Sequence, residues 1–137
     1  MAAAAAAFGP GRVAVVSNSA GLAQYDPDGA EARALELYHH AVEVDKNQSA
    51  MYRLAGVYQF GWLGQAVDDE RALSLYKRGA ELGDYVCRCY LGWDIYAQGG
   101  CGVEVDLKQA LYWLEKANEQ SGGRHVPHIE AIRDRMS

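Results

Sequence analysis

The chain has 137 residues, of which 50% are hydrophobic and 23% are charged, and its formal net charge is −5. This composition is typical of one soluble globular domain with a core of modest size. The acidic balance, with no cluster of Lys or Arg, argues against nucleic acid as a partner, because phosphate backbones are bound mainly by cations. No apolar run reaches the roughly 20 residues of a transmembrane helix, so we predict no membrane span.

Residues 1–29 are predicted to form a leader that is flexible or irregular and contains at most one short strand. Alanines fill positions 2–7, but the segment GPGR (9–12) interrupts the apolar run, and arginines are too few for a typical targeting signal. We therefore predict a cytoplasmic location, with organellar targeting by this leader as the open alternative. Residues 13–16 have the composition of a short buried strand, and turn-forming residues follow at 17–21.

A decapeptide pattern then recurs at one fixed interval, as ALELYHHAVE (34–43), ALSLYKRGAE (72–81) and ALYWLEKANE (110–119). In each copy, small and bulky apolar residues follow the i, i+3, i+4, i+7 spacing of one helix face. The match continues without a gap through the segment before the second and third copies, including its glycines: Gly61, Gly64, Gly99 and Gly102. Self-similarity at a fixed period of this length is typical of stacked helical hairpins.

Two complete hairpins and half of a third are predicted from this pattern. Their first helices are expected over 49–61 and 85–98, and a helix over 30–45 is expected to be the second half of an earlier hairpin. Asp68 and Asp106 stand where second helices begin, where a carboxylate can accept hydrogen bonds from free backbone amides. The apolar stripes of the two first helices comprise Ala50, Leu54, Val57 and Tyr58, and Cys87, Leu91 and Ile95.

A short C-terminal helix is expected to open at Pro127, because proline is favoured in the first turn of a helix. Its apolar residues would cover the open end of the stack. The predicted organisation is therefore a leader (1–29), a repeat array (30–121) and a C-terminal capping helix (122–137).

The segment GGCGVEVDLKQALYWLEKANEQSG (99–122) resembles the core of a Sel-1-like repeat, a relative of the tetratricopeptide repeat. The preceding unit, GQAVDDERALSLYKRGAELGD (64–84), is similar but has Leu75 where the family more often has tryptophan, and Gly79 where it has alanine. The matching residues of the later unit are Gly100, Gly102, Val103, Asp106, Ala110, Trp113, Lys116 and Ala117. The resemblance covers roughly residues 30–121 and implies an all-α solenoid of about two and a half α/α hairpins.

This resemblance also implies a non-catalytic adaptor that binds a protein or peptide in the groove formed by the first helices. Four residues that lie off the packing stripes are the candidate partner-binding residues: Arg53, Gln59, Arg88 and Trp93. An array of fewer than three units leaves apolar surface at its ends, here at Leu35, Leu37 and Tyr38. Self-association through these uncovered ends is therefore a further expectation.

No catalytic residue, metal site or cofactor is predicted. His39 and His40 are adjacent, so on a helix they point about 100° apart and cannot bind one ion from the same face. His125 and His128 have no cysteine or carboxylate at standard ligand spacing. The acidic run at 68–70 is explained by the start of a helix.

Residues 11–36 support an alternative hypothesis, because they resemble the second motif of haloacid-dehalogenase-type phosphatases, especially the phosphatidylglycerophosphate phosphatase branch. The resemblance implies that Ser17 would hold the transferring phosphoryl group. The chain contains no aspartate upstream of Ser17, and phosphoryl transfer of this kind needs an aspartate nucleophile. The alternative is therefore a phosphatase fragment fused to repeats and inactive by itself.

Overall fold

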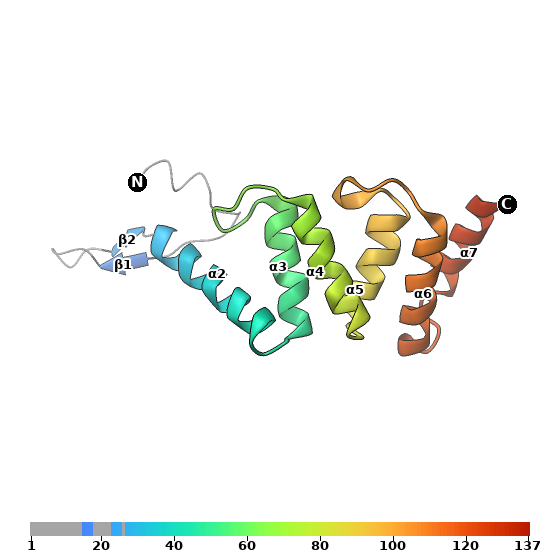
Figure 1. The fold of residues 1–137 in the computed structure, drawn as a ribbon, viewed down its shortest axis with the longest axis horizontal. Helices are drawn as coiled ribbons and strands as arrows, with labels where there is room; N and C mark the ends of the chain where they lie inside the picture. The colour runs from blue at the N-terminus through green and yellow to red at the C-terminus, as the bar shows by residue number, and fades with distance from the viewer. Residues whose placement is uncertain (1–14, 18–22, 26) are drawn as a thin grey trace.

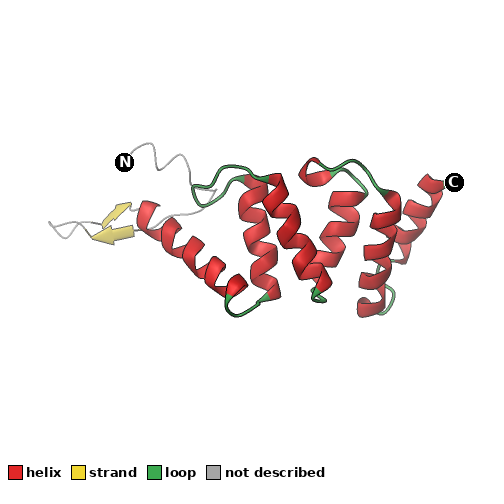
Figure 2. Ribbon diagram, viewed as in Figure 1, coloured by secondary structure: helices red, strands yellow, loops and turns green. Residues whose placement is uncertain are grey.

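The computed structural model describes residues 15–17, 23–25 and 27–137, which are predominantly helical (Figures 1 and 2). A short hairpin of β1 (Val15–Ser17) and β2 (Ala23–Tyr25) precedes the helices. The other elements are α2 (Pro27–Glu43), α3 (Gln48–Phe60), α4 (Asp69–Glu81), α5 (Tyr85–Cys89), a π-helical segment (Tyr90–Tyr96), a 3-10 turn (Gly100–Gly102), α6 (Leu107–Ser121) and α7 (Val126–Met136).

The helices stand side by side in an elongated row that runs from α2 to α7 (Figure 1). The first hairpin consists of α3 and α4, and the second consists of α5, its π-helical continuation and α6. On either side, α2 packs against α3 and α7 packs against α6. The prediction of an all-α solenoid of helical hairpins is confirmed.

In each complete hairpin, both helices begin with a residue whose side chain accepts a hydrogen bond from a free backbone amide of the first turn. Asp68 and Asp106 accept hydrogen bonds from the amides of Arg71 and Gln109, both at 3.1 Å, as the sequence predicts. The first helices use the same device, with acceptors on Asn47 (2.9 Å, from Ala50) and Asp84 (2.8 Å, from Cys87). A cap of this kind stabilises a helix by about 1 kcal/mol.

The loops between paired helices repeat in detail. Gly61 and Gly99 end the first helices with left-handed backbone angles (φ 72° and 80°), which favour glycine. Each loop is then closed by one backbone hydrogen bond of 2.8 Å, from Asp68 to the carbonyl of Tyr58 and from Asp106 to that of Tyr96. The helix-ending glycine and the hydrogen bond that closes the loop therefore recur at the same interval as the decapeptide.

Each of these loops also lies over a carboxylate of the preceding second helix. A Cβ on Gly64 would lie 3.5 Å from Oε2 of Glu31, and one on Gly102 would lie 3.3 Å from Oδ2 of Asp69. These two acidic residues are separated by the same interval as the repeats, and Glu31 is only 6% exposed. Consecutive hairpins therefore contact each other at their loops as well as through their helices.

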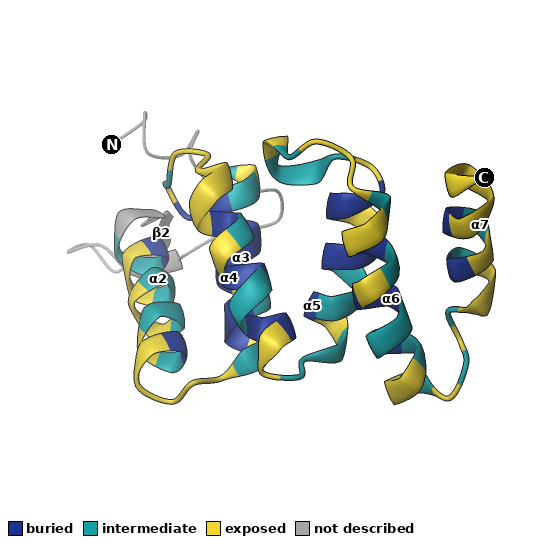
Figure 3. Cartoon of the chain, turned by 45° about the vertical axis from the view of Figure 1, so that its right-hand side comes forward, coloured by how far each residue is buried: buried dark blue, intermediate teal, exposed yellow. Residues whose placement is uncertain are grey.

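The core lies where neighbouring helices meet (Figure 3). Both predicted apolar stripes of the first helices are buried, as expected. α7 contributes Ile129 and Ile132, which are 6% and 0% exposed, so it covers the end of the second hairpin. The largest fully buried side chains are Tyr76, Met51, Leu54, Leu91, Ile95, Leu114, Ile132 and Val42.

The gap-free alignment of the two first helices needs a correction. The helix-ending glycines Gly61 and Gly99 are separated by the full repeat interval, whereas the capping residues Asn47 and Asp84 are one position closer together. The second hairpin therefore has one extra residue inside its first helix. It lies within the π-helical segment Tyr90–Tyr96, because a π turn accommodates one more residue than an α turn.

This insertion leaves the buried side of the helix intact. Leu91 and Ile95 are both 0% exposed, whereas Trp93 between them is partly buried and Asp94 is exposed. In the first hairpin, the corresponding interval between Leu54 and Val57 is one residue shorter. The π turn thus adds a residue to the helix while Leu91 and Ile95 both stay in the core.

At the N-terminal end, the structure refines the expected elements. β1 pairs antiparallel with β2, with Val15 opposite Tyr25, whereas the predicted strand began at residue 13, which lies outside the described residues. α2 spans Pro27–Glu43 instead of 30–45. The rest of the predicted leader lies mostly outside the described residues.

Candidate functional site

The outward side of α3 carries a stripe of exposed side chains. Arg53 and Phe60 are seven positions apart and therefore share a helix face. Trp62 follows the helix, and its ring lies over Gly56, where an added Cβ would come within 3.2 Å of the ring atom Cζ3. We call Arg53, Phe60 and Trp62 the α3 stripe.

The aromatic end of the α3 stripe is a stacked pair of rings. The ring centroids of Phe60 and Trp62 are 5.0 Å apart with an interplanar angle of 29°. The two residues nevertheless remain 51% and 39% exposed. Adjacent exposed aromatic side chains of this kind are common anchors at protein interfaces.

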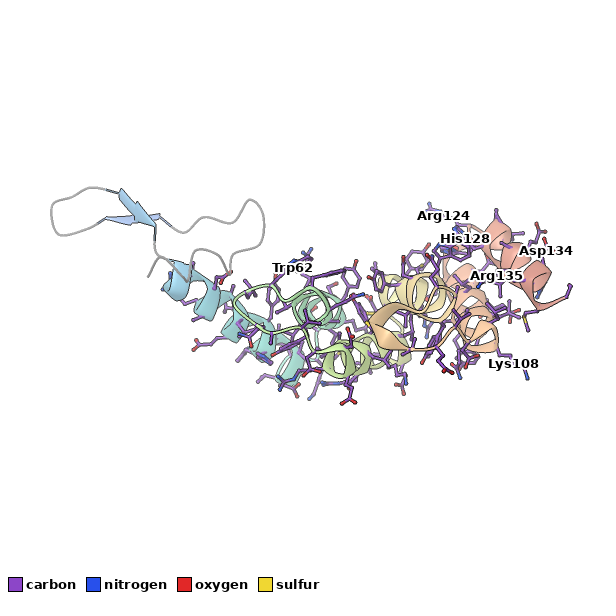
Figure 4. All side chains as sticks on the ribbon, turned by 90° about the horizontal axis from the view of Figure 1, so that it is seen from above. Trp62, Lys108, Arg124, His128, Asp134 and Arg135 are labelled. Atoms are coloured by element: carbon purple, nitrogen blue, oxygen red, sulfur yellow. The ribbon has the colours of Figure 1, made fainter. Side chains whose placement is uncertain are left out.

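Arg53 supplies the charged end of the α3 stripe. Its side chain is exposed, and within the described part of the chain no ion pair or hydrogen bond engages its guanidinium. Seen from above, Trp62, Arg124 and His128 lie along one long side of the array, and Lys108 lies on the opposite side (Figure 4). The Trp62 end of the α3 stripe therefore lies on the side of the array opposite Lys108.

Gln59 lies at the seam between the two hairpins. Its side-chain oxygen accepts hydrogen bonds from the hydroxyl groups of Tyr76 (2.7 Å) and Tyr90 (3.0 Å). These two tyrosine rings stack with centroids 4.7 Å apart, and burial raises the pKa of Tyr76, so its hydroxyl stays a neutral donor. Gln59 thereby joins α3 to α4 and to the π-helical segment.

Arg88 is engaged at the opposite end of the helices. Its Nε donates to the carbonyl oxygen of Ala80 (2.9 Å), and its Nη1 donates to Oε1 of Gln120 (2.9 Å). Gln120 in turn donates to the carbonyl of Gly83 (2.8 Å). These bonds tie the turn between α4 and α5 to α6.

Trp93 joins the π-helical segment to α7. Its ring is half-buried and contacts His128 edge-on, with centroids 4.5 Å apart and an interplanar angle of 77°. Of the four candidate residues, Arg53 alone is exposed, while Gln59, Arg88 and Trp93 are partly buried at three different seams. Their role in partner binding stays a prediction.

Phe60 is a member of the surface that the sequence analysis missed. The signal for it was available, because Phe60 lies off the buried stripe of α3 and seven residues after Arg53. What the sequence does not give is the position of Trp62, which lies beyond the end of the helix. Only the fold of the loop places that ring beside Phe60.

A second polar cluster lies where α7 meets α5. The Nε2 atom of His125 is 2.5 Å from the hydroxyl of Tyr85 and 3.3 Å from Sγ of Cys89. The backbone amide of His125 donates to Oδ1 of Asn118 (2.9 Å). The Nδ1 atoms of His125 and His128 are buried and make no hydrogen bond within the described residues. This arrangement holds a neutral imidazole at the start of α7.

We expect this cluster to make stability depend on pH. Burial, and then the nearby charges of His128 and Arg124, lower the pKa of His125 below its ordinary value of 6.5. The unfolded chain therefore binds a proton more readily than the folded chain, so this contribution to stability is present above pH 6.5 and decreases as the pH falls through the lowered pKa. Tyr85 and Cys89 face the same ring from α5.

Urea unfolding at pH 5.5 and pH 7.5 measures this effect. The stability difference between the two pH values should be smaller in His125→Gln than in the wild-type protein. His40→Gln is the matched control. The side chain of His40 is 63% exposed, and its ion pair with Asp45 (3.6 Å) is exposed as well, so its removal should change stability little at either pH. An equal difference in His125→Gln and the wild type would contradict the assignment.

Two surface hollows formed by the described residues are small. One of about 290 Å³ lies between α6 and α7, with Glu115, Glu119 and Glu130 around Val126 and Ile129. Another of about 350 Å³ is lined by side chains of α4 alone, so it is a depression on one helix. Small-molecule sites usually fall between about 300 and 1,000 Å³ and converge from several elements. The exposed α3 stripe is the stronger candidate site.

At the N-terminal end, apolar side chains of α2 are only partly covered. Leu35 and Tyr38 pack against the core, but Leu37 is 70% exposed, and Val44, which follows α2, is 64% exposed. This agrees only in part with the expectation that Leu35, Leu37 and Tyr38 would all be uncovered. Self-association through the array ends stays a prediction.

The described residues give no support to the phosphatase alternative. Ser17 ends β1, which pairs antiparallel with β2 in a two-stranded sheet, and helical hairpins follow. A phosphatase of that type requires an α/β core with a larger sheet. Among the described residues, no three His, Cys, Asp or Glu side chains gather as a metal site would require, and no helix has both the length and the apolar character of a membrane span.

Comparison with known proteins agrees with this architecture. The Sel1 repeat family model matches residues 48–84 and 86–122, which together make up more than half of the chain. Among solved structures, the chain is similar to a Sel1 repeat protein from Oxalobacter formigenes, with 31% sequence identity and a TM-score of 0.58. That similarity covers 66% of this chain and 34% of the other protein, so the chain spans about a third of its length. No curated protein matches.

The matches and the fold lead to the same conclusion. The two matched segments begin at positions 48 and 86, and this interval is that of the repeated decapeptide. Repeats of this kind indicate a helical scaffold for protein–protein interaction, and their family is generally non-catalytic. With two adjacent repeats folded as stacked α/α hairpins, this chain belongs to the Sel1 repeat family.

Proposed function

We propose that this repeat array is a non-catalytic adaptor that holds an extended segment of a protein on the outward side of its first helices, with the α3 stripe as the anchor. The observation that carries the proposal is the stacked Phe60–Trp62 pair, which stays 51% and 39% exposed on a well-packed helix. Repeat arrays present elongated surfaces of this kind to extended ligands.

The proposal assigns different roles to the four candidate residues from the sequence. Arg53 would contact the partner directly, because its guanidinium is exposed. Gln59 and Arg88 would act by holding the two hairpins in register, since both are already bonded at the seams. Trp93 would extend the surface toward α7 through its contact with His128.

Selection of phage-displayed random twelve-residue peptides on the folded protein tests the proposal. The selected peptides should bind the double variant Arg53→Gln, Trp62→Ala at least about tenfold more weakly than the wild type, because loss of interface anchors typically costs more than about 1 kcal/mol. Isothermal titration calorimetry gives the affinities, and circular dichroism shows whether each variant remains folded.

The matched control is the double variant Lys108→Gln, Tyr112→Ala. It removes one exposed cation and one half-exposed aromatic side chain from α6, with Lys108 on the opposite side of the array (Figure 4). This control should bind the selected peptides with wild-type affinity. Equal weakening by both double variants, or by neither, would show that the α3 stripe is not the binding surface.

A further inference from the structure

We infer that the segment bound by the α3 stripe is a polyproline-II segment that carries a carboxylate three residues away from a proline. This inference rests on the proposed function and specifies the chemistry of its ligand. It follows from three properties of the α3 stripe: the exposed stacked rings, the spacing between those rings and Arg53, and the sign of the free charge.

The aromatic end of the α3 stripe suits a proline ring. Phe60 and Trp62 present two roughly parallel rings, with an interplanar angle of 29°, that other side chains leave half-exposed. Proline-rich segments bind to aromatic side chains because the proline rings pack on the flat, apolar faces of the aromatic rings. The backbone of such a segment is also already ordered before binding. Binding such a segment therefore costs little conformational entropy.

The spacing of the α3 stripe selects the backbone conformation of the ligand. Phe60 is seven positions after Arg53 in α3, so their Cα atoms are about 10 Å apart along the helix axis. In a polyproline-II segment, residues i and i+3 lie on one side and are about 9 Å apart. In a β-strand, residues on one side recur every two positions, about 7 Å or about 13 Å apart, so they fit this interval less well.

The positive charge of the α3 stripe favours a carboxylate on the ligand. Arg53 is a cation on a chain of net charge −5, and within the described residues no carboxylate neutralises it. A carboxylate on the ligand would form a charge-assisted hydrogen bond with its guanidinium. Because polyproline-II segments are nearly symmetric along their length, the carboxylate can precede or follow the proline.

Fluorescence anisotropy with labelled twelve-residue peptides tests the inference. The probes contain a central Glu-Pro-Pro-Pro or Pro-Pro-Pro-Glu. Two comparison peptides accompany each probe, one with Gln in place of Glu and one with Ala in place of every Pro. At least one Glu–Pro order should bind. Replacing Glu with Gln should weaken that binding about tenfold, as expected for a charge-assisted pair, and replacing the prolines should weaken it at least as much.

Variants of the protein assign each effect to a side chain. Arg53→Gln should abolish the preference for Glu over Gln, and Arg53→Glu should reverse it, so that a Lys-Pro-Pro-Pro or Pro-Pro-Pro-Lys probe binds better. Both changes are at an exposed position and should leave the fold intact. Trp62→Ala should weaken every proline probe, whereas Lys108→Gln should weaken none.

The inference is overturned if no order of the Glu–Pro probes binds, or if the wild-type protein binds the Gln probes as tightly as the Glu probes. The peptide selection described above distinguishes a failure of this inference from a failure of the proposed function. Phage-selected peptides that depend on the α3 stripe but lack proline or a carboxylate would retain the proposed function and reject this ligand chemistry. Selected peptides that ignore the α3 stripe would reject both.

Discussion

Replacing Gly92 with alanine is expected to lower the free energy of unfolding by about 2 kcal/mol. A Cβ at this position would lie 2.9 Å from Cγ of Leu114, 3.1 Å from the carbonyl oxygen of Ala110 and 3.2 Å from the amide nitrogen of Leu114. Two of these atoms belong to the backbone of α6, so α6 would have to move as a whole. Overpacking of this kind costs up to about 3 kcal/mol, and the higher helix propensity of alanine offsets about 1 kcal/mol.

Urea unfolding followed by circular dichroism measures this loss, and Gly56→Ala is the matched control. Gly56 is also a buried helical glycine, but the atoms its Cβ would meet belong to the ring of Trp62, a partly exposed side chain that can shift. We expect Gly56→Ala to leave stability unchanged or to raise it by up to about 1 kcal/mol, through the same gain in helix propensity. Equal losses in the two variants would show that the close contact between the π-helical segment and α6 is not the cause.

Replacing Gly79 with alanine is expected to cost a similar amount, about 2 kcal/mol, for a reason that a second substitution can remove. The new Cβ would clash with Sγ of Cys87 and would lie 3.3 Å from Cβ of Cys87 and 3.6 Å from that of Met51. Cys87 is 0% exposed, and buried side chains are closely packed, so its sulfur atom can move aside only at a cost. The clash is therefore with one side chain and not with a backbone.

A double-mutant cycle with Cys87→Ala tests this explanation. Cys87→Ala alone should destabilise the protein by about 1 kcal/mol through lost packing, yet it removes the sulfur atom that the new methyl group at position 79 would meet. The double variant should be more stable than the sum of the two losses predicts, by at least about 1 kcal/mol. Burial raises the pKa of the Cys87 thiol, so no charge is lost in this cycle. Strict additivity would contradict the proposed contact.

The Gly79–Cys87 contact also shows why the repeat departs from its family pattern. Gly79 stands where the resemblance led us to expect alanine, and the structure shows that Cys87 of the next helix occupies that space. The missing side chain of Gly79 on α4 thus leaves room for the side chain of Cys87 on α5. The substitution is visible in the sequence, but its partner is identified only when the helices are packed.

The fold was predictable because its signals are local and repeated. Apolar residues at helical spacing, Asp68 and Asp106 at helix starts, and glycines at one interval are properties of short segments, and all of them keep their predicted roles. The π turn was not predictable from the same pattern. A gap-free match between the two units hides an extra residue that the helix absorbs between Leu91 and Ile95.

The binding surface was predictable only in part. Position off a buried stripe identifies residues that do not face the core of their own hairpin, and Arg53 is indeed exposed. The same criterion selected Gln59 and Arg88, whose polar groups are instead bonded to a neighbouring hairpin or helix. Periodicity describes one helix at a time, so it cannot distinguish a side chain that faces solvent from one that faces the next repeat.

The sequence by itself determined the repeat length, the helices, the caps of the second helices and the apolar stripes of the core, because each depends on interactions between near neighbours in the chain or on a repeating apolar face. The tertiary structure alone decided the pairing of Phe60 with Trp62, the tyrosine seam around Gln59, and the docking of α7 on Trp93 through His128. These contacts join different elements, or a helix to the loop that follows it. Their geometry is fixed only when the chain has packed.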